Sequence, residues 1–229
     1  MRIWDIQPGY LNRQSLLGEH RELHAIVSII VNKKKGYSKH PETLRWIGYG
    51  WALRQRHQLL SAEIALRGYS EQSPVKTRSK KGIWPDILID SPIQQYQILH
   101  SKYENKEQGR IPLPLNAQHL WRHHKYSVMA RDVSLYQKLG PQVAQMRPSH
   151  DFSDLAMFLC KILRQPPDKK VLRNALLHMW GYVSERQGNK KINNCSLKSL
   201  IMRIQKRAID CNNQYISEST ALSELAAWM

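Results

Sequence analysis

The chain has 229 residues, of which 41% are hydrophobic and 23% charged, a composition typical of a folded protein with a core. No apolar run approaches the roughly 20 residues that a membrane-spanning helix needs, and the first twenty residues lack the pattern of a secretory signal. Three cysteines (Cys160, Cys195 and Cys211) follow no metal-ligand spacing and suit a reducing compartment. We expect a cytoplasmic protein, and the length favours two domains.

The charge is strongly unbalanced, with 35 Lys and Arg against 18 Asp and Glu and a net charge of +17. Such a surface attracts polyanions, because neutralising phosphates releases condensed counterions. An anionic membrane is a poorer candidate, since no basic helix carries a bulky apolar face. Nucleic acid is therefore the expected partner, although charge does not distinguish DNA from RNA.

Apolar spacing predicts three helices in the first hundred residues, at 14–32, from about Pro41 to Arg67, and at 93–103. The run KKKGYSKHP separates the first two helices, and Gly48 and Gly50 are expected to kink the second near its start. Residues 70–92 have the composition of a basic loop with a short extended piece.

The stretch 104–116 is polar and then rich in proline, which is typical of a linker. We place the linker at 108–115, between a first domain at 1–107 and a second at 116–229. Apolar spacing then predicts four or five more helices and a short terminal one, at about 116–131, 133–146, 151–164, 168–187 and 195–213. The expected fold class is mostly α, a compact helical domain followed by a helical bundle.

The first helix carries an unusual run of ionisable residues in LLGEHRELHAI. With 3.6 residues per turn, Leu16, Leu23 and Val27 share one direction, which is expected to face the core. His20 and His24 flank this stripe, whereas Glu22 lies roughly 160–200° around the helix from them. Glu22 is either a solvated helix carboxylate or a functional group that a ligand can approach closely.

The pair His20 and His24 has the i, i+4 spacing of a helical zinc pair. It lacks the glutamate position of an H-E-x-x-H metalloprotease helix, because Glu22 points away from both rings. A histidine beside an apolar stripe is more often hydrogen-bonded within the core. We therefore expect no metal site.

Three pieces of the first half resemble the pyrimidine-dimer DNA glycosylase (endonuclease V) family. They are the start MRIWDI, the block LLGEHRELHAI, and LRQRHQLLSAEIALRGY at 53–69. The similarity extends over roughly residues 1–105 and includes charged and glycine positions as well as apolar ones. It implies a helical DNA-repair enzyme that excises a damaged or modified pyrimidine and then nicks the strand as an AP lyase.

The resemblance also implies a catalytic mechanism without a cofactor. In that family the nucleophile is the N-terminal amine, which forms a Schiff base with the sugar; the matching positions are Met1 for the nucleophile and Glu22 for the active-site carboxylate. An α-amine has an ordinary pKa of about 7.7–8.0, so a useful fraction is neutral at pH 7. Family arginines match Arg2 and Arg21, and Arg2 is too large to permit the usual removal of Met1.

The second half is similar to the YbgA-like domain of unknown function. The similarity rests on QHLWRHHKYSVMARDVSLYQKLG and NALLHMWGYVSERQG, at 118–140 and 174–188. A role in engaging nucleic acid is plausible for this domain. Trp121, Tyr126 and Trp180 are expected to be core residues rather than base-stacking platforms.

The expected nucleic-acid contacts combine the resemblance with the basic clusters of both halves. They are Arg2, Arg21, Arg54, Arg56, Lys80, Lys81, His123, His124 and Lys125. Damaged or modified duplex DNA is the expected substrate, and RNA stays open. The alternative is a non-catalytic or RNA-directed binding protein on the same basic helical framework.

Overall fold

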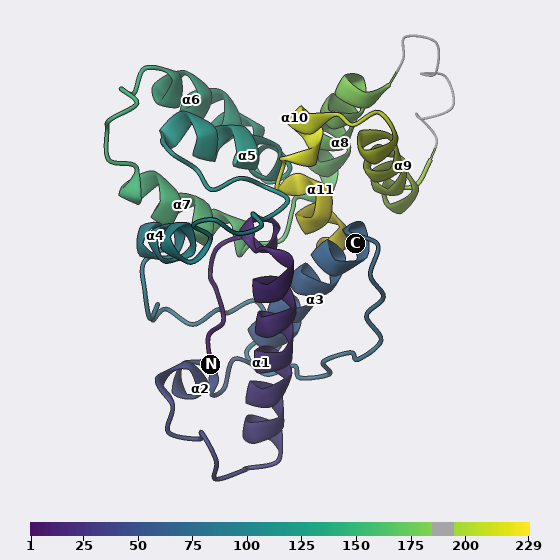
Figure 1. The fold of residues 1–229 in the computed structure, drawn as a ribbon. Helices are drawn as coiled ribbons and strands as arrows, with labels where there is room; N and C mark the ends of the chain where they lie inside the picture. Colours follow the sequence, from purple (N-terminus) through teal and green to yellow (C-terminus); the bar gives the residue numbers. More distant parts are fainter. Residues whose placement is uncertain (185–194) are drawn as a thin grey trace. The chain divides into compact units, whose positions relative to one another are not determined.

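A computed structural model describes residues 1–184 and 195–229 (Figure 1). Every regular element in these residues is helical, which confirms the mostly α fold class. The chain divides into two compact units, Met1–Gly109 and Arg110–Met229. The stretch expected as a linker, 108–115, spans this boundary. No helix among the described residues is both long and apolar enough to cross a membrane.

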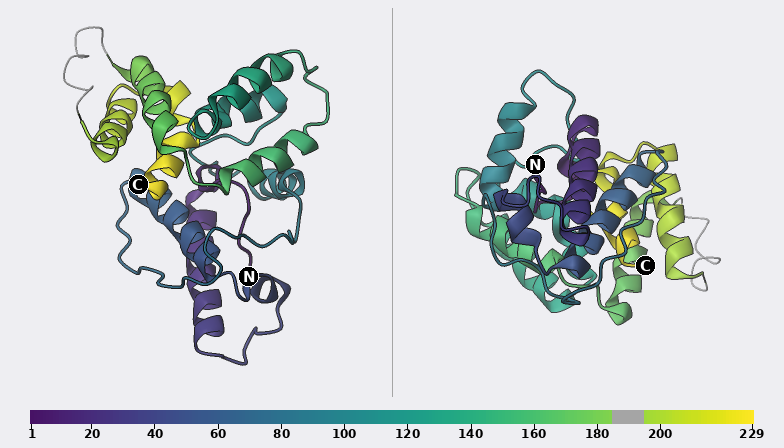
Figure 2. Two further views of the ribbon diagram at one scale, coloured as in Figure 1. Left: turned by 180° about the vertical axis from the view of Figure 1, so that it is seen from behind. Right: turned by 90° about the horizontal axis from the view of Figure 1, so that it is seen from below.

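The first unit contains one 3-10 turn and four α-helices. They are η1 (Pro8–Tyr10), α1 (Arg13–Val31), α2 (Pro41–Trp46), α3 (Gly50–Leu66) and α4 (Pro92–Lys102). Helix α1 packs against α3 and α2. The chain's first residues run as an extended segment between α1 and α4, as the views in Figures 1 and 2 show.

The single helix expected at 41–67 is wrong, because the chain breaks after α2 and restarts at α3. Gly48 causes the break by adopting a φ of 84°, a left-handed conformation that an α-helix excludes and glycine tolerates. The following loop is fastened to the start of α3, where Thr77 donates to the Gly50 carbonyl at 2.7 Å and Ser79 accepts from the Gly50 N–H. No strand forms in the described residues 70–91, so the expected extended piece is irregular.

Helix starts follow local side-chain chemistry. Asn12 accepts from the Ser15 N–H and caps α1. Ser91 and Gln94 form a reciprocal capping box at α4, with a proline at the first helical position. Asp168 caps α8 in the second unit. These caps determine the residue at which each helix begins, which the apolar pattern alone does not define.

The second unit is built around α5. Its elements are α5 (Ala117–Met129), α6 (Val133–Ala144), α7 (Ser153–Leu163), α8 (Lys169–Val183), α9 (Leu197–Asp210), α10 (Gln214–Ser217), α11 (Ala221–Glu224) and η3 (Leu225–Trp228). Helix α5 contacts α6, α7, α8 and α11. Each helix expected here starts within about two residues of the observed one, and the end of the helix expected at 168–187 lies outside the described residues.

Polar contacts hold the C-terminal helices on α5. The Thr220 N–H and hydroxyl both donate to the His123 carbonyl, at 2.8 and 2.9 Å. Arg131 forms a buried ion pair with Glu224 at 2.7 Å. Trp121, Tyr126 and Trp180 are all buried, which confirms them as core residues.

Candidate functional site at the N-terminal segment

The Glu22 carboxylate lies beside the first peptide bond of the chain. Its Oε2 accepts a hydrogen bond of 2.5 Å from the backbone N–H of Arg2. That nitrogen closes the peptide bond of Met1, so the carboxylate is within one residue of the Met1 α-amine. Glu22 and Met1 are both partly exposed, which leaves the pair accessible from solvent.

The rest of the segment is fixed by side chains of α1 and α4. Trp4 donates its N–H to Glu19 of α1 at 3.2 Å. Asp5 donates its N–H to Gln95 of α4 at 2.8 Å, and Gln95 returns a side-chain N–H to the Asp5 carboxylate at 2.9 Å. These hydrogen bonds hold the backbone N–H groups of Trp4 and Asp5 in place, so that the chain start lies beside Glu22.

Buried ion pairs also hold the N-terminal segment in place. Arg56 of α3 donates twice to Glu19, at 2.7 and 2.8 Å, and once to the Ile6 carbonyl at 2.8 Å. Burial raises the pKa of Glu19 above its ordinary value, and the Arg56 guanidinium opposes that rise. Arg45 of α2 pairs with Asp5 at 2.6 Å, with both side chains only 2% exposed. Charge is thus used here as structural support.

The last basic residue of the block 53–69 also contacts the chain start. Arg67 pairs with buried Glu63 at 2.8 Å and donates to the Pro8 and Gly9 carbonyls at 3.4 and 3.3 Å. These charged positions therefore hold the N-terminal segment in place.

The buried face of α1 differs from the expected one. It includes Glu19, Leu23 and Ile26, whereas Val27 and Ile30 are partly exposed. Apolar spacing does not identify a buried carboxylate such as Glu19, whose burial becomes tolerable through its ion pair with Arg56. Glu22 consequently lies at the edge of the buried face, next to the extended segment.

Several of the expected nucleic-acid contacts lie on the surface of the first unit. Arg21, Lys80 and Lys81 are exposed, and the Lys80 ammonium lies 4.3 Å from the Tyr49 ring centroid. Arg54 is partly buried. These positions leave Arg21 and the two lysines able to meet a phosphate backbone.

Arg2 is engaged within the protein. Its guanidinium forms an ion pair with Asp90 and lies 4.7 Å from the centroid of the Trp4 ring. A phosphate must therefore displace Asp90 to reach Nη2 of Arg2. Asp90 could not be predicted from the sequence, because it lies in a loop far along the chain from Arg2.

Three expected contacts are corrected. Arg56 is 2% exposed and neutralises Glu19, so its guanidinium is unavailable to a phosphate. His123 and His124 are buried in α5, where burial lowers their pKa values to about 3 and about 4. Both rings are neutral at pH 7 and carry no charge to a surface. Lys125, the next residue, is partly exposed, with its ammonium 4.9 Å from the Tyr215 ring centroid.

A second group of ionisable residues gathers on another side of α1. His20 and His24 meet His57 of α3 and Glu71 of the following loop. Burial lowers the pKa of His20 and lowers that of His57 to about 4. Sequence reasoning identified only the α1 pair, because the spacing of His57 and Glu71 matches no local motif.

Comparison with known families divides the chain in two. Residues 1–77 match the family model described as pyrimidine dimer DNA glycosylase. Residues 125–225 match a family described as a protein of unknown function (DUF1722). No curated protein and no solved structure matches the chain. Both resemblances in the sequence are thereby confirmed: residues 1–77 are similar to the pyrimidine dimer DNA glycosylase family, and residues 125–225 are similar to DUF1722 proteins.

Proposed function

We propose that this protein is a DNA glycosylase with AP lyase activity, in which Met1 and Glu22 are the catalytic residues. The observation that carries the proposal is the hydrogen bond from the Arg2 N–H to Glu22, which brings a carboxylate next to the Met1 amine. The family match of residues 1–77 supports a DNA glycosylase type of enzyme, and the net charge of +17 suits a DNA substrate.

The first step breaks the glycosidic bond of a damaged or modified pyrimidine. The neutral Met1 amine attacks C1′ of the sugar, and the base departs with the electron pair of the C1′–N bond and takes up a proton. A base must leave the helical stack for the amine to reach C1′. The Glu22 carboxylate stabilises the positive charge that develops on the sugar.

The second step nicks the strand. The nitrogen loses a proton, the C1′–O4′ bond breaks with transfer of a proton to O4′, and a protonated Schiff base forms between Met1 and C1′. Removal of a C2′ proton then expels the 3′ phosphate oxygen by β-elimination, and water hydrolyses the imine to restore the amine. We assign the movement of these protons to Glu22, whose carboxylate accepts from the Arg2 N–H.

The DNA backbone is held by exposed basic side chains of the same unit. We assign this role to Arg21, Lys80 and Lys81, which are exposed, and to Arg2 after exchange of Asp90 for a phosphate. Arg54 is assigned a lesser part because it is partly buried. The charge-assisted contacts position the strand but do not select a base.

The Glu22→Gln variant tests the proposal on duplexes that carry an abasic site or a UV-induced dimer. Glutamine can still accept from the Arg2 N–H, so the segment stays in place while the carboxylate charge is lost. We expect cleavage to fall by about 10²–10⁴-fold, the usual contribution of a positioned acid or base. DNA affinity should change by less than about threefold.

Glu104→Gln provides the matched control, because Glu104 is exposed and lies outside the site. It should cleave like the unmodified protein. Equal cleavage by the Glu22→Gln variant and this control would contradict the role of Glu22. Tight binding to DNA or RNA without cleavage of either duplex by the unmodified protein would instead support the non-catalytic binding protein.

A further inference from the structure

Three imidazoles and one carboxylate converge between α1, α3 and the loop that follows α3. His20 Nε2 lies 3.2 Å from His57 Nε2 and 3.5 Å from a Glu71 oxygen. His57 Nε2 lies 3.8 Å from the other Glu71 oxygen. With one ligand atom taken from each, His20, His24, His57 and Glu71 all lie within 4.8 Å of one another.

The donor set and the spacing both suit Zn²⁺. Zinc prefers four ligands in a tetrahedron, with Zn–N distances of about 2.0–2.1 Å and Zn–O distances of about 2.0–2.2 Å. Tetrahedral geometry at those bond lengths separates neighbouring ligand atoms by roughly 3.4 Å. Three observed separations, 3.2, 3.5 and 3.8 Å, lie near that value, and the complete set of four ligand atoms lies within 4.8 Å.

Two further features suggest a ligand. His24 Nε2 is buried and has no hydrogen-bond partner in the described structure. Such an orphaned nitrogen is costly unless something else binds it. Ser61 also approaches both His57 Nδ1 and a Glu71 oxygen, each at 3.4 Å, which is the kind of outer contact that orients metal ligands.

The cluster is not sealed from solvent, because the His20 and Glu71 side chains keep exposures of 15% and 12%. His24 also lines an open pocket of about 450 Å³ formed by α1 and the loop residues 74–77. An ion can therefore reach the ligands without unfolding the unit.

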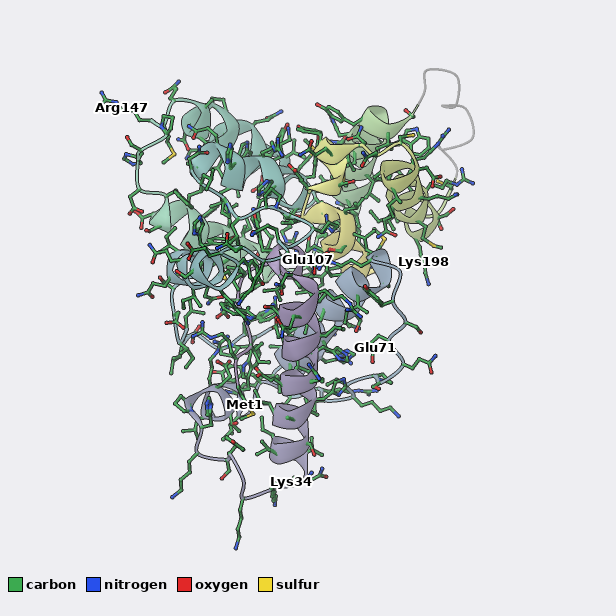
Figure 3. The ribbon with its side chains drawn as sticks, in the orientation of Figure 1. Met1, Lys34, Glu71, Glu107, Arg147 and Lys198 are labelled. Carbon is green, nitrogen blue, oxygen red and sulfur yellow. The ribbon has the colours of Figure 1, made fainter. Side chains whose placement is uncertain are left out.

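We propose that His20, His24, His57 and Glu71 bind one Zn²⁺ ion that ties α1 to α3 and to the loop after α3. Four protein ligands fill a tetrahedral site, so the ion has a structural role rather than binding a substrate. Figure 3 shows Glu71 and Met1 on opposite sides of α1. The zinc site is thus separate from the proposed glycosylase site, and either can fail without the other.

The test is a zinc titration of the full chain after treatment with a chelator, followed by calorimetry. We expect one Zn²⁺ per chain and a higher unfolding temperature when zinc is added. His57→Gln removes a central ligand and should weaken zinc binding by at least about 100-fold. His100→Gln changes an exposed histidine of the same unit and should bind zinc like the unmodified protein.

Cobalt substitution keeps the test independent of folding defects. Co²⁺ in the unmodified protein should give the visible absorption of a four-coordinate nitrogen and oxygen site, without a thiolate charge-transfer band. The proposal is overturned if zinc binds no more tightly to the unmodified protein than to the His57→Gln variant. A thiolate band or an octahedral cobalt spectrum would overturn it equally, because the ion would then be held by other groups.

Discussion

Glu19 and Glu22 lie three residues apart on one helix and differ in burial and in pairing. Glu19 is 2% exposed, receives two hydrogen bonds from Arg56 and supports the extended segment. Glu22 is partly exposed and meets the backbone next to Met1. A carboxylate already neutralised by a guanidinium is a poor proton carrier, whereas no cation pairs with the Glu22 side chain among the described residues.

The Arg56→Leu variant tests whether Arg56 stabilises the fold by neutralising buried Glu19. It leaves the Glu19 charge buried without its partner, which typically costs about 3–5 kcal/mol. We expect a corresponding loss in the free energy of unfolding, measured by chemical denaturation. The double variant Arg56→Leu, Glu19→Gln removes the buried charge as well and should be less destabilised than Arg56→Leu alone.

The Arg56→Leu variant also distinguishes a structural role of Arg56 from a role in binding DNA. At temperatures where it is folded, the Arg56→Leu variant should bind abasic DNA with an unchanged salt dependence, because the guanidinium faces Glu19 rather than solvent. A stable Arg56→Leu protein with weaker and less salt-dependent DNA binding would contradict this assignment.

At the scale of elements, the sequence predicted most helices and missed the break at Gly48. Apolar spacing located α1, α4 and the helices of the second unit, because their periodicity is local. The break depends on the conformation of one glycine, which the spacing of neighbouring apolar residues does not record. The contacts of Gln95 and Arg45 with Asp5 were equally inaccessible, since they join residues that are distant in the chain.

Gly48→Ala tests the cause of that break. Alanine at a φ of 84° is strained by about 1–2 kcal/mol relative to glycine, so the unfolding temperature should fall by several degrees. Gly36→Ala is the control, because Gly36 has no positive φ and no atom within 4 Å of an added Cβ. Equal stability of the two variants would show that the left-handed turn does not terminate α2.

Across the whole molecule, some basic residues are buried and form ion pairs inside the protein, whereas others, such as Lys80 and Lys81, are exposed on the surface. Composition predicted a polyanionic partner, but it could not show which basic residues are buried, because the net charge counts Arg56 and Lys81 alike. The family resemblance predicted a candidate site at Met1 and Glu22. The hydrogen bond that brings Glu22 next to the start of the chain could be seen only in the folded structure. Of the four residues in the histidine and glutamate cluster, the sequence indicated only His20 and His24, through their i, i+4 spacing.

The Lys80→Gln, Lys81→Gln double variant tests the contact role of the exposed charges. Each lost phosphate contact should reduce the slope of log affinity against log salt by about 0.9, so the double variant should lose up to roughly 1.8. Lys206→Gln is the control, because Lys206 pairs with Asp210 at 3.0 Å in the second unit. An unchanged slope in the double variant would place the DNA elsewhere.

Catalysis by the Met1 amine is tested most directly by borohydride trapping of the untagged protein on DNA that carries an abasic site, followed by peptide mapping. We expect a covalent adduct on the Met1 amine, lost when that amine is acetylated. An adduct on a lysine side chain, or no adduct despite tight DNA binding, would contradict it.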